Sequence, residues 1–161
     1  LCKLCRLRQE PRVGILMFDA PDQTVMVSLR NRSLTGREES MIITGVDIIE
    51  LERISNAFDR WGDRFIKRVY TEREREYCRG RIPQLAGRFA AKEAVMKAFG
   101  TGLYGLGWKD VEVVRLRGRR PEIEIHGRGL VIYQRQGIIQ LNLSISHSRD
   151  YAVALVVGER P

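Results

Sequence analysis

The sequence predicts an α+β fold in which a mainly antiparallel sheet packs against a long central helix. Residues 85–99 have an uninterrupted helical pattern that ends at Gly100 and Gly102. Near the C-terminus, residues 141–147 alternate apolar and polar side chains, and a short turn leads into a second apolar strand over 151–157. A long helix and a hairpin in one chain indicate mixed rather than purely helical architecture.

Length and composition exclude several protein classes. The 161 residues are 43% hydrophobic, which is typical of a globular chain and too apolar for a disordered one. No apolar stretch approaches the length that a transmembrane helix needs, and no secretory signal is visible. Cys2, Cys5 and Cys78 form neither a disulfide framework nor a four-ligand zinc site, so we expect a cytoplasmic protein.

Residues 1–40 differ from the rest of the chain. Prolines and glycine interrupt any long element, only residues 24–29 resemble a short strand, and residues 30–40 have the polar composition of a linker. Met41 then opens an apolar run. We therefore expect an N-terminal extension over 1–40, poorly ordered or foreign to the natural product, and a folded unit over 41–161. Most of the net charge of +8 lies in that unit.

The elements of the folded unit follow in order. Residues 42–48 form a strand that is apolar on both faces, which predicts a central or covered position. A helix over 49–61 follows, and its pattern continues over 65–69. The Thr71–Glu74 capping box begins another helix, which ends near Cys78. The remaining predicted elements are a loop around Pro83, the helix 85–99, strands 111–116 and 122–126 joined by a turn, a short helix or strand at 130–134, and the hairpin 141–147 with 151–157.

Asp47 is unexpected because it lies in an otherwise aliphatic strand. A buried carboxylate must be paired, hydrogen-bonded or bound to a metal ion. The alternative is that Asp47 caps the following helix, although the apolar Ile48 and Ile49 intervene. We favour a functional role.

Glu93 and Lys97 lie side by side on the long helix. Helical geometry places Glu93 beside the apolar stripe of Phe89 and Met96, with Lys97 one turn further along. An ordinary ion pair between residues four apart prefers a solvated face, whereas alanines flank this pair and leave room for a ligand. Both interpretations stay open from these residues alone.

Two further segments could contact a ligand. The sequence Gly100-Thr101-Gly102 ends the long helix, either as a simple glycine cap or as a place where a ligand approaches the backbone. Ser146, His147 and Ser148 end a strand, either as a polar turn or as anion-binding donors. A Ser-His-Asp hydrolase is disfavoured because adjacent strand residues point to opposite faces.

Together these residues indicate magnesium-assisted phosphate chemistry. Two carboxylates from different elements, Asp47 and Glu93, can hold Mg²⁺, which prefers oxygen ligands. The nearby cations Arg88, Lys92 and Lys97 would bind phosphate oxygens. That combination suits phosphoryl or pyrophosphate chemistry.

Three motifs of this chain resemble those of the holo-acyl-carrier-protein synthases. They are Gly45-Val46-Asp47-Ile48 with Glu50 and Arg53-Ile54, then Arg88-Phe89-Ala90-Ala91-Lys92-Glu93-Ala94 with Lys97 and the Gly100-Thr101-Gly102 exit, and Ser144-Ile145-Ser146-His147 followed by Tyr151-Ala152. The resemblance covers residues 41 to about 158 and none of 1–40. The segment between Thr71 and Leu85 looks short for the family.

The resemblance implies a 4′-phosphopantetheinyl transferase fold and a Mg²⁺-dependent transfer of phosphopantetheine from coenzyme A to a serine of apo acyl carrier protein. Asp47 and Glu93 would hold Mg²⁺, and Lys97 would steady the pyrophosphate. A metal-bound water or a carboxylate would accept the serine proton. Arg88, Gly100, Thr101, Gly102, Ser146 and His147 would contact the cofactor. Arg53, and with less support Arg60, would face the acidic carrier, and the family implies a homotrimer with interfacial sites.

Two alternatives belong to other classes. A basic nucleic-acid-binding module would explain the arginines, which number 23 of the 28 basic residues, but not Asp47 or Glu93 in apolar settings. A different Mg²⁺-dependent nucleotide enzyme lacks a phosphate-binding loop in this sequence. The sequence therefore favours the transferase. We expect neither a nucleic-acid partner nor a membrane-spanning segment.

Overall fold

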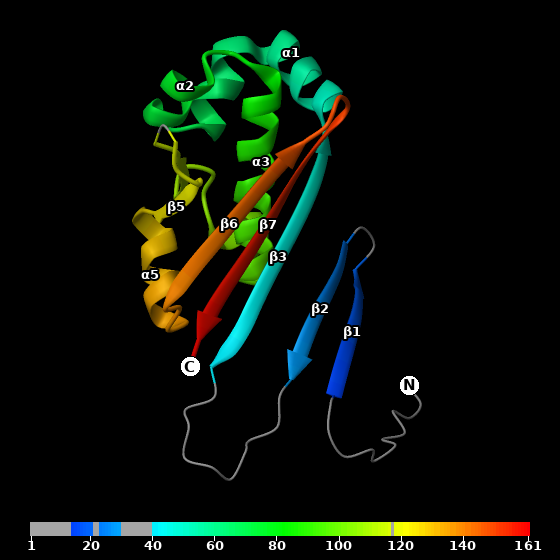
Figure 1. The fold of residues 1–161 in the computed structure, drawn as a ribbon, viewed down its shortest axis with the longest axis vertical. Coiled ribbons are helices and arrows are strands. Elements are labelled where there is room, and N and C mark those ends of the chain that lie inside the picture. Colours follow the sequence, from blue (N-terminus) through cyan, green and yellow to red (C-terminus); the bar gives the residue numbers. More distant parts are fainter. Residues whose placement is uncertain (1–13, 21–22, 30–39, 117) are drawn as a thin grey trace. The chain divides into compact units, whose positions relative to one another are not determined.

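The computed structural model describes residues 14–20, 23–29, 40–116 and 118–161, and its part from residue 40 onward contains a three-stranded sheet. Its strand order is β3 (Met41–Glu50), β7 (Tyr151–Arg160), β6 (Gln140–His147). Strands β6 and β7 form the predicted antiparallel hairpin, and β3 runs opposite to β7 (Figure 1). The expected α+β fold with a mainly antiparallel sheet is therefore confirmed.

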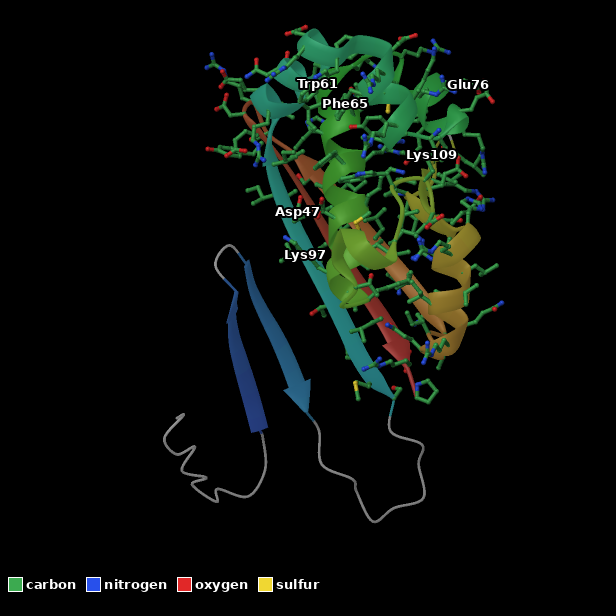
Figure 2. All side chains as sticks on the ribbon, turned by 180° about the vertical axis from the view of Figure 1, so that it is seen from behind. Asp47, Trp61, Phe65, Glu76, Lys97 and Lys109 are labelled. Carbon is green, nitrogen blue, oxygen red and sulfur yellow. The ribbon has the colours of Figure 1, made fainter. Side chains whose placement is uncertain are left out.

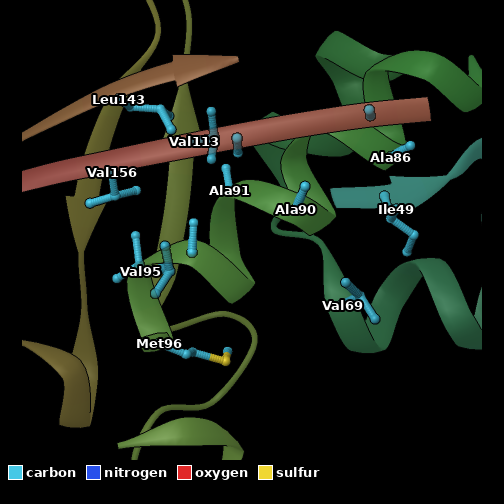
Figure 3. Close-up of a cluster of buried hydrophobic side chains, with 14 of the residues drawn as sticks. Ile49, Val69, Ala86, Ala90, Ala91, Val95, Met96, Val113, Leu143 and Val156 are labelled. Atoms are coloured by element: carbon cyan, nitrogen blue, oxygen red, sulfur yellow. The ribbon is translucent and has the colours of Figure 1, made fainter. Parts of the chain in front are cut away.

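Helix α3 (Ile82–Ala98) packs across this sheet, mainly against β7 (Figure 1). It begins three residues before the predicted start because Pro83 lies in its first turn, where a missing N–H is tolerated. Small side chains make the close packing possible, since Ala86, Ala90 and Ala91 of the helix are fully buried (Figure 3). This contact is the core of the folded unit.

Two helices precede α3 in the chain. Helix α1 (Leu51–Val69) joins the two predicted helical segments and is broken at Gly62, whose φ of 48° favours glycine. Helix α2 (Glu72–Cys78) begins with the predicted capping box: the Thr71 side chain accepts from the Glu74 N–H, and Glu74 accepts from the Thr71 N–H. The capping box therefore acts as the sequence indicated.

Four shorter elements lie between α3 and β6 in the sequence. Helix α4 (Gly102–Gly105) leads to the antiparallel strands β4 (Val111–Val114) and β5 (Glu122–Ile125), which form a separate two-stranded sheet. The ambiguous segment near residues 130–134 is helical, within α5 (Gly127–Arg135). None of the helices in the described part of the chain is long and apolar enough to cross a membrane.

Strand β3 departs from its predicted setting. It lies at the edge of the sheet rather than in the centre, and one face of it is exposed. Ile42, Val46 and Ile48 are 60%, 55% and 62% exposed. The prediction of a strand covered on both faces is wrong for a single chain, because apolar alternation does not distinguish burial in a fold from burial by another molecule.

The chain divides into two compact units, Leu1–Met41 and Ile42–Pro161. The first contains the antiparallel hairpin of β1 (Gly14–Ala20) and β2 (Gln23–Leu29), with Gly14 opposite Leu29. Only the second of these strands was predicted, since Gly14 and Pro11 argued against an element there. The Cys2 and Cys5 pair and most of the predicted linker lie outside the described residues.

Candidate active site

Asp47 and Lys97 form an ion pair between β3 and α3. The Lys97 Nζ donates a hydrogen bond of 2.9 Å to the Asp47 Oδ1, and Figure 2 shows the two residues at adjoining parts of the strand and helix. Their side chains are 14% and 21% exposed for Asp47 and Lys97 respectively. The pair is thus largely shielded yet still reachable from solvent.

Gly45 brings the two elements together. A Cβ atom on this residue would lie 1.9 Å from the Ala94 carbonyl oxygen and 2.8 Å from the Ala98 nitrogen. Only glycine permits that approach of β3 to the helix backbone. Asp47 lies two residues further along the strand and therefore points to the same side, towards α3.

Glu93 completes an electrostatic group with these two residues. Burial raises the pKa of its carboxyl above the ordinary value, the Asp47 charge raises it further, and Lys97 partly offsets both. No ion pair within the described part of the chain joins Glu93 to Lys97. The simple helical pair considered from the sequence is therefore not formed, because the ammonium turns to Asp47 instead.

The pKa of Asp47 is also raised, chiefly by burial, while the Lys97 hydrogen bond and charge and the more distant Arg53 lower it. Asp47 does not cap α1, whose N-cap is Glu50. Two carboxylates with raised pKa values and one ammonium leave excess negative charge when both carboxylates ionise. A divalent cation with oxygen preference, such as Mg²⁺, fits this donor set and would relieve the repulsion.

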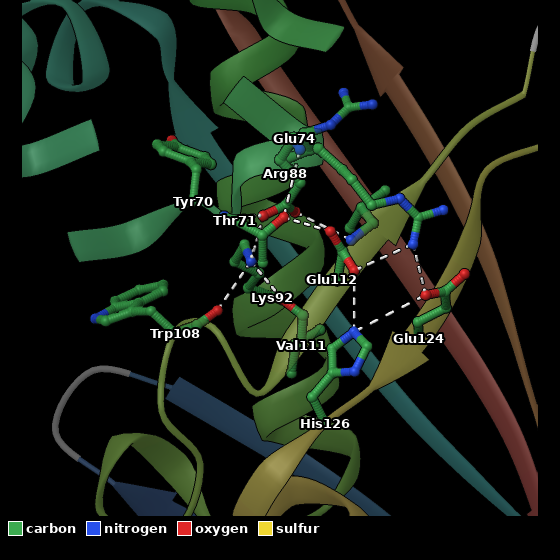
Figure 4. Close-up of polar contacts among 12 residues, drawn as sticks. Tyr70, Thr71, Glu74, Arg88, Lys92, Trp108, Val111, Glu112, Glu124 and His126 are labelled. Carbon is green, nitrogen blue, oxygen red and sulfur yellow. Dashed lines mark hydrogen bonds and ion pairs between the residues drawn. The ribbon is translucent and has the colours of Figure 1, made fainter. Parts of the chain in front are cut away.

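Lys92 does not belong to this site, contrary to the expectation that it would bind phosphate. Its side chain is fully buried, and its Nζ lies 2.8 Å from Glu74 Oε2 and 2.8 Å from the Trp108 carbonyl oxygen (Figure 4). It also donates to the Val111 carbonyl oxygen. An ammonium has three donors, and these three partners use all of them.

Arg88 lies deep in the fold, with 4% of its surface exposed. Its guanidinium stacks 4.1 Å from the Tyr77 ring centroid and donates to the Gln84 carbonyl oxygen at 3.3 Å. The Arg88 Nε is buried and has no hydrogen-bond partner among the described residues. Contact of Arg88 with a coenzyme A phosphate stays a prediction.

The helix exit has the backbone geometry expected of glycines. Gly100 and Gly102 adopt φ values of 67° and 54°, and the Gly100 N–H bonds to the Lys97 carbonyl oxygen. Thr101 between them has a buried hydroxyl oxygen, for which the described part of the chain offers no hydrogen-bond partner. This segment follows Lys97 directly and so lies at the end of α3 that carries the ion pair.

Ser146 and His147 lie at the end of β6, where both are exposed and opposite Val153 and Ala152 of β7. In the part of the chain that the structure covers, no hydrogen bond or ion pair joins them to Asp47, Glu93 or Lys97. Within the described residues, a single chain therefore forms no direct polar contact between these predicted residues and the carboxylates. Ser148 forms the turn itself, accepting from the Asp150 and Tyr151 N–H groups.

The predicted partner-binding arginines both lie on α1 and are exposed. Arg53 is 3.6 Å from Glu50 in an exposed ion pair, and the Arg60 guanidinium lies 4.9 Å from the Trp61 ring centroid. Both guanidiniums are thus available to a further anionic group.

The structure contains one cluster of ionisable side chains that the sequence did not predict. Glu112, Glu124 and His126 place ligand atoms within 4.8 Å of one another, because the two glutamates are directly opposite on β4 and β5. Arg73 lies 3.4 Å from Glu112 and 2.8 Å from Glu124. The cluster already contains a cation, so it is an ion-pair network (Figure 4).

Comparisons with known proteins give the family. The family described as the 4′-phosphopantetheinyl transferase superfamily matches residues 43–156. A holo-[acyl-carrier-protein] synthase of Gloeobacter violaceus is 47% identical over 116 residues, covering 70% of this chain and 88% of that protein. The Herpetosiphon aurantiacus protein of the same name is 44% identical over 125 residues, covering 73% and 98%.

Solved structures agree with the sequence relatives. The Helicobacter pylori holo-[acyl-carrier-protein] synthase in complex with coenzyme A has a TM-score of 0.67 and 29% identity, covering 72% of this chain and 99% of that one. The Bacillus anthracis enzyme in complex with coenzyme A (3′,5′-ADP) has a TM-score of 0.60 and 38% identity, covering 74% and 96%. The resemblance found in the three motifs is thereby confirmed. This chain belongs to the 4′-phosphopantetheinyl transferase superfamily, among the holo-[acyl-carrier-protein] synthases.

Proposed function

We propose that Asp47, Glu93 and Lys97 form the site at which this transferase moves 4′-phosphopantetheine from coenzyme A to a serine of apo acyl carrier protein. The products are holo acyl carrier protein and adenosine 3′,5′-bisphosphate. The observation that carries the proposal is the shielded Asp47–Lys97 ion pair beside Glu93, since both carboxyl pKa values are raised there. It lies within the residues that the family shares.

Asp47 and Glu93 would hold Mg²⁺, which when bound would neutralise pyrophosphate charge. Lys97 is the cation of this chain that donates to a pyrophosphate oxygen and stabilises the charge that grows on the leaving phosphate. For that contact its Nζ must turn from the Asp47 Oδ1 towards the substrate. Arg88 would bind a further phosphate of coenzyme A, and the Gly100-Thr101-Gly102 segment would contact coenzyme A through its backbone.

Arg53 and Arg60 would bind the acidic surface of the carrier protein. Both lie on α1, which begins directly after the strand that carries Asp47. Exposed opposite charges steer association and fix orientation more than they add affinity. The positive balance of the chain, +8, therefore serves an acidic protein and a phosphate-rich cofactor.

A homotrimer would complete the site. Ile42, Val46 and Ile48 of β3 and Tyr151 and Leu155 of β7 are large apolar residues that are exposed on the sheet. Apolar patches of this kind mark association surfaces. A neighbouring copy that covers them would also bring Ser146 and His147 to another chain's cofactor, which explains why one chain does not unite them with Asp47. Sedimentation velocity would test this: Val46→Asp should shift the protein from trimer to monomer, and an unchanged trimer would contradict the interface.

Transfer itself is tested by mass spectrometry. We expect apo acyl carrier protein, coenzyme A and Mg²⁺ to give a phosphopantetheine-modified carrier with this chain and none with Glu93→Gln. EDTA should stop the reaction and added Mg²⁺ should restore it. A cytoplasmic location suits these substrates and stays a prediction. Absence of a mass gain across several bacterial carriers would refute the activity.

A further inference from the structure

The ion pair between Glu74 and Lys92 is buried completely, with neither side chain exposed. It joins α2 to α3, and the Lys92 ammonium also donates to the Trp108 and Val111 carbonyl oxygens, which come just before and at the start of β4. Burial lowers the pKa of Lys92, while the Glu74 charge and hydrogen bond oppose that shift. One ammonium thus ties α3 to two other segments (Figure 4).

Glu74 is equally well bound. Its Oε2 accepts from the Thr71 N–H at 2.9 Å as part of the capping box, and its Oε1 accepts from the Val113 N–H at 3.0 Å. The carboxylate therefore links the start of α2, strand β4 and Lys92 of α3. Such a fully satisfied polar group tolerates little rotation of the helix that it holds.

Lys92 directly precedes Glu93, so the two side chains leave α3 about 100° apart. The backbone of the next residue, Ala94, packs against Gly45 of β3, where an added Cβ would lie 1.9 Å from its carbonyl oxygen. Helix α3 is thus held at Lys92 and at Ala94, two positions apart. Glu93 lies between these two contacts and its charge interacts with that of Asp47.

We propose that the buried Glu74–Lys92 pair is a positioning element that sets the rotation of α3 and so directs Glu93 towards Asp47. The inference rests on the proposed role of Asp47 and Glu93 as ligands of a divalent cation. Lys92 and Glu74 touch neither substrate nor metal in this scheme. They act through the helix, just as residues that hydrogen-bond to metal ligands fix the orientation of those ligands.

An energetic argument supports a role in specificity. Burying two charges is unfavourable, and well-packed apolar residues of similar volume often stabilise a protein as well or better. Stability alone is therefore a poor explanation for the buried pair. Its geometric demands, three acceptors around one ammonium and three donors around one carboxylate, are instead suited to selecting one orientation of α3.

Metal binding tests the proposal without relying on turnover. Mn²⁺ binding to the full chain is measured by electron paramagnetic resonance in the presence of coenzyme A, for the wild type, Lys92→Met and the double variant Lys92→Met/Glu74→Gln. The double variant avoids an unpaired buried carboxylate and is expected to fold. We expect the Kd for Mn²⁺ to rise about tenfold or more in both variants, at a temperature well below each Tm.

Three further variants separate the possible outcomes. Val156→Ala shortens a fully buried side chain of β7, so it lowers Tm without touching the pair, and its Kd for Mn²⁺ should stay at the wild-type value. Glu93→Gln tests the metal site itself: if it leaves Mn²⁺ binding unchanged, the proposed function fails independently of Lys92. Lys92→Arg keeps the charge and should recover part of the Mn²⁺ affinity.

The proposal is overturned if the folded double variant binds Mn²⁺ as the wild type does while Glu93→Gln does not, because the pair would then serve stability only. It is also overturned if the double variant fails to give the wild-type circular dichroism spectrum. That result would make the pair a requirement for folding rather than for the orientation of Glu93.

Discussion

The Lys97 Nζ lies 2.9 Å from the Asp47 Oδ1 and thereby joins the long helix to the edge strand of the sheet. The two residues are 50 positions apart in sequence. The ammonium neutralises one of two neighbouring carboxylates with raised pKa values, and among the described residues the second, Glu93, forms no ion pair. Under the proposed function, Lys97 would exchange this contact for one with a pyrophosphate oxygen, and Asp47 would hold Mg²⁺.

Replacing Lys97 by Met should lower kcat by about 100-fold or more, because the growing charge of the leaving phosphate loses its donor. The Asp47 pKa should rise further, since Lys97 now lowers it by hydrogen bond and charge. Steady-state kinetics with saturating carrier protein would measure the loss. Lys67→Met is the matched control, as Lys67 forms an exposed pair with Asp63 on α1, and a similar loss there would contradict the assignment.

Replacing Glu93 by Gln should stabilise the metal-free protein at pH 8 while abolishing transfer. The folded pKa of Glu93 lies above its ordinary value of 4.5, so the folded state binds the proton more tightly than the unfolded state. The free energy of unfolding thus falls as the pH rises from the ordinary value through the raised one. Gln has no charge to desolvate, and we expect Tm to rise by a few degrees.

Thermal unfolding in EDTA between pH 4 and pH 8 would check this pH dependence. The difference between Glu93→Gln and the wild type should shrink as the pH falls towards 4, where the wild-type carboxyl is also neutral. Glu76→Gln on the exposed face of α2 is the control and should not show that trend. A constant difference at every pH would show that the charge of Glu93 is not the cause.

Replacing Gly45 by Ala should destabilise the fold by about 3 kcal/mol, because the new methyl group collides with the backbone of α3. Urea unfolding would measure the change. Since β3 must move away from the helix, the Asp47–Lys97 pair should break and transfer should fall with it. Thr44→Ala, at the exposed neighbouring position, should leave both properties near the wild-type values.

Charge reversal at Arg53 and Arg60 should raise the KM for acyl carrier protein about tenfold and leave the KM for coenzyme A unchanged. The physical reason is the loss of exposed positive charge that steers an acidic partner, and added salt should reduce the difference from the wild type. Arg119→Glu, in the exposed turn before β5, is the control. Equal effects on both substrates would place the arginines elsewhere in the mechanism.

Deleting residues 1–40 should leave catalysis largely unchanged. The family match begins at residue 43, and the second compact unit begins at Ile42. The assay compares kcat and both KM values of the shortened and full chains, with Tm as a check on folding. A loss of more than tenfold in kcat/KM at an unchanged Tm would assign these residues a part in the reaction.

Local signals in the sequence predicted most elements because they depend on nearest neighbours. The capping box at Thr71, the hairpin of β6 and β7 and the glycine exit of α3 all act within a few residues. The start of α3 was placed late because Pro83 was interpreted as a loop residue rather than as part of a first turn. The first strand of the N-terminal hairpin, Gly14–Ala20, is not predicted, because it begins with a glycine, is flanked by Pro11 and Pro21, and lacks an apolar–polar alternation.

The sequence by itself determined the family, the fold class and the candidates Asp47, Glu93 and Lys97, since a carboxylate in an aliphatic strand and a glutamate beside an apolar stripe are visible without coordinates. Only the tertiary structure decided what those charges face. It paired Lys97 with Asp47, and it assigned Lys92 to Glu74 rather than to phosphate. It also left one face of β3 exposed. The reason is that hydrophobic periodicity reports which side of an element avoids water, whereas the partner of a charge depends on segments far away in the chain.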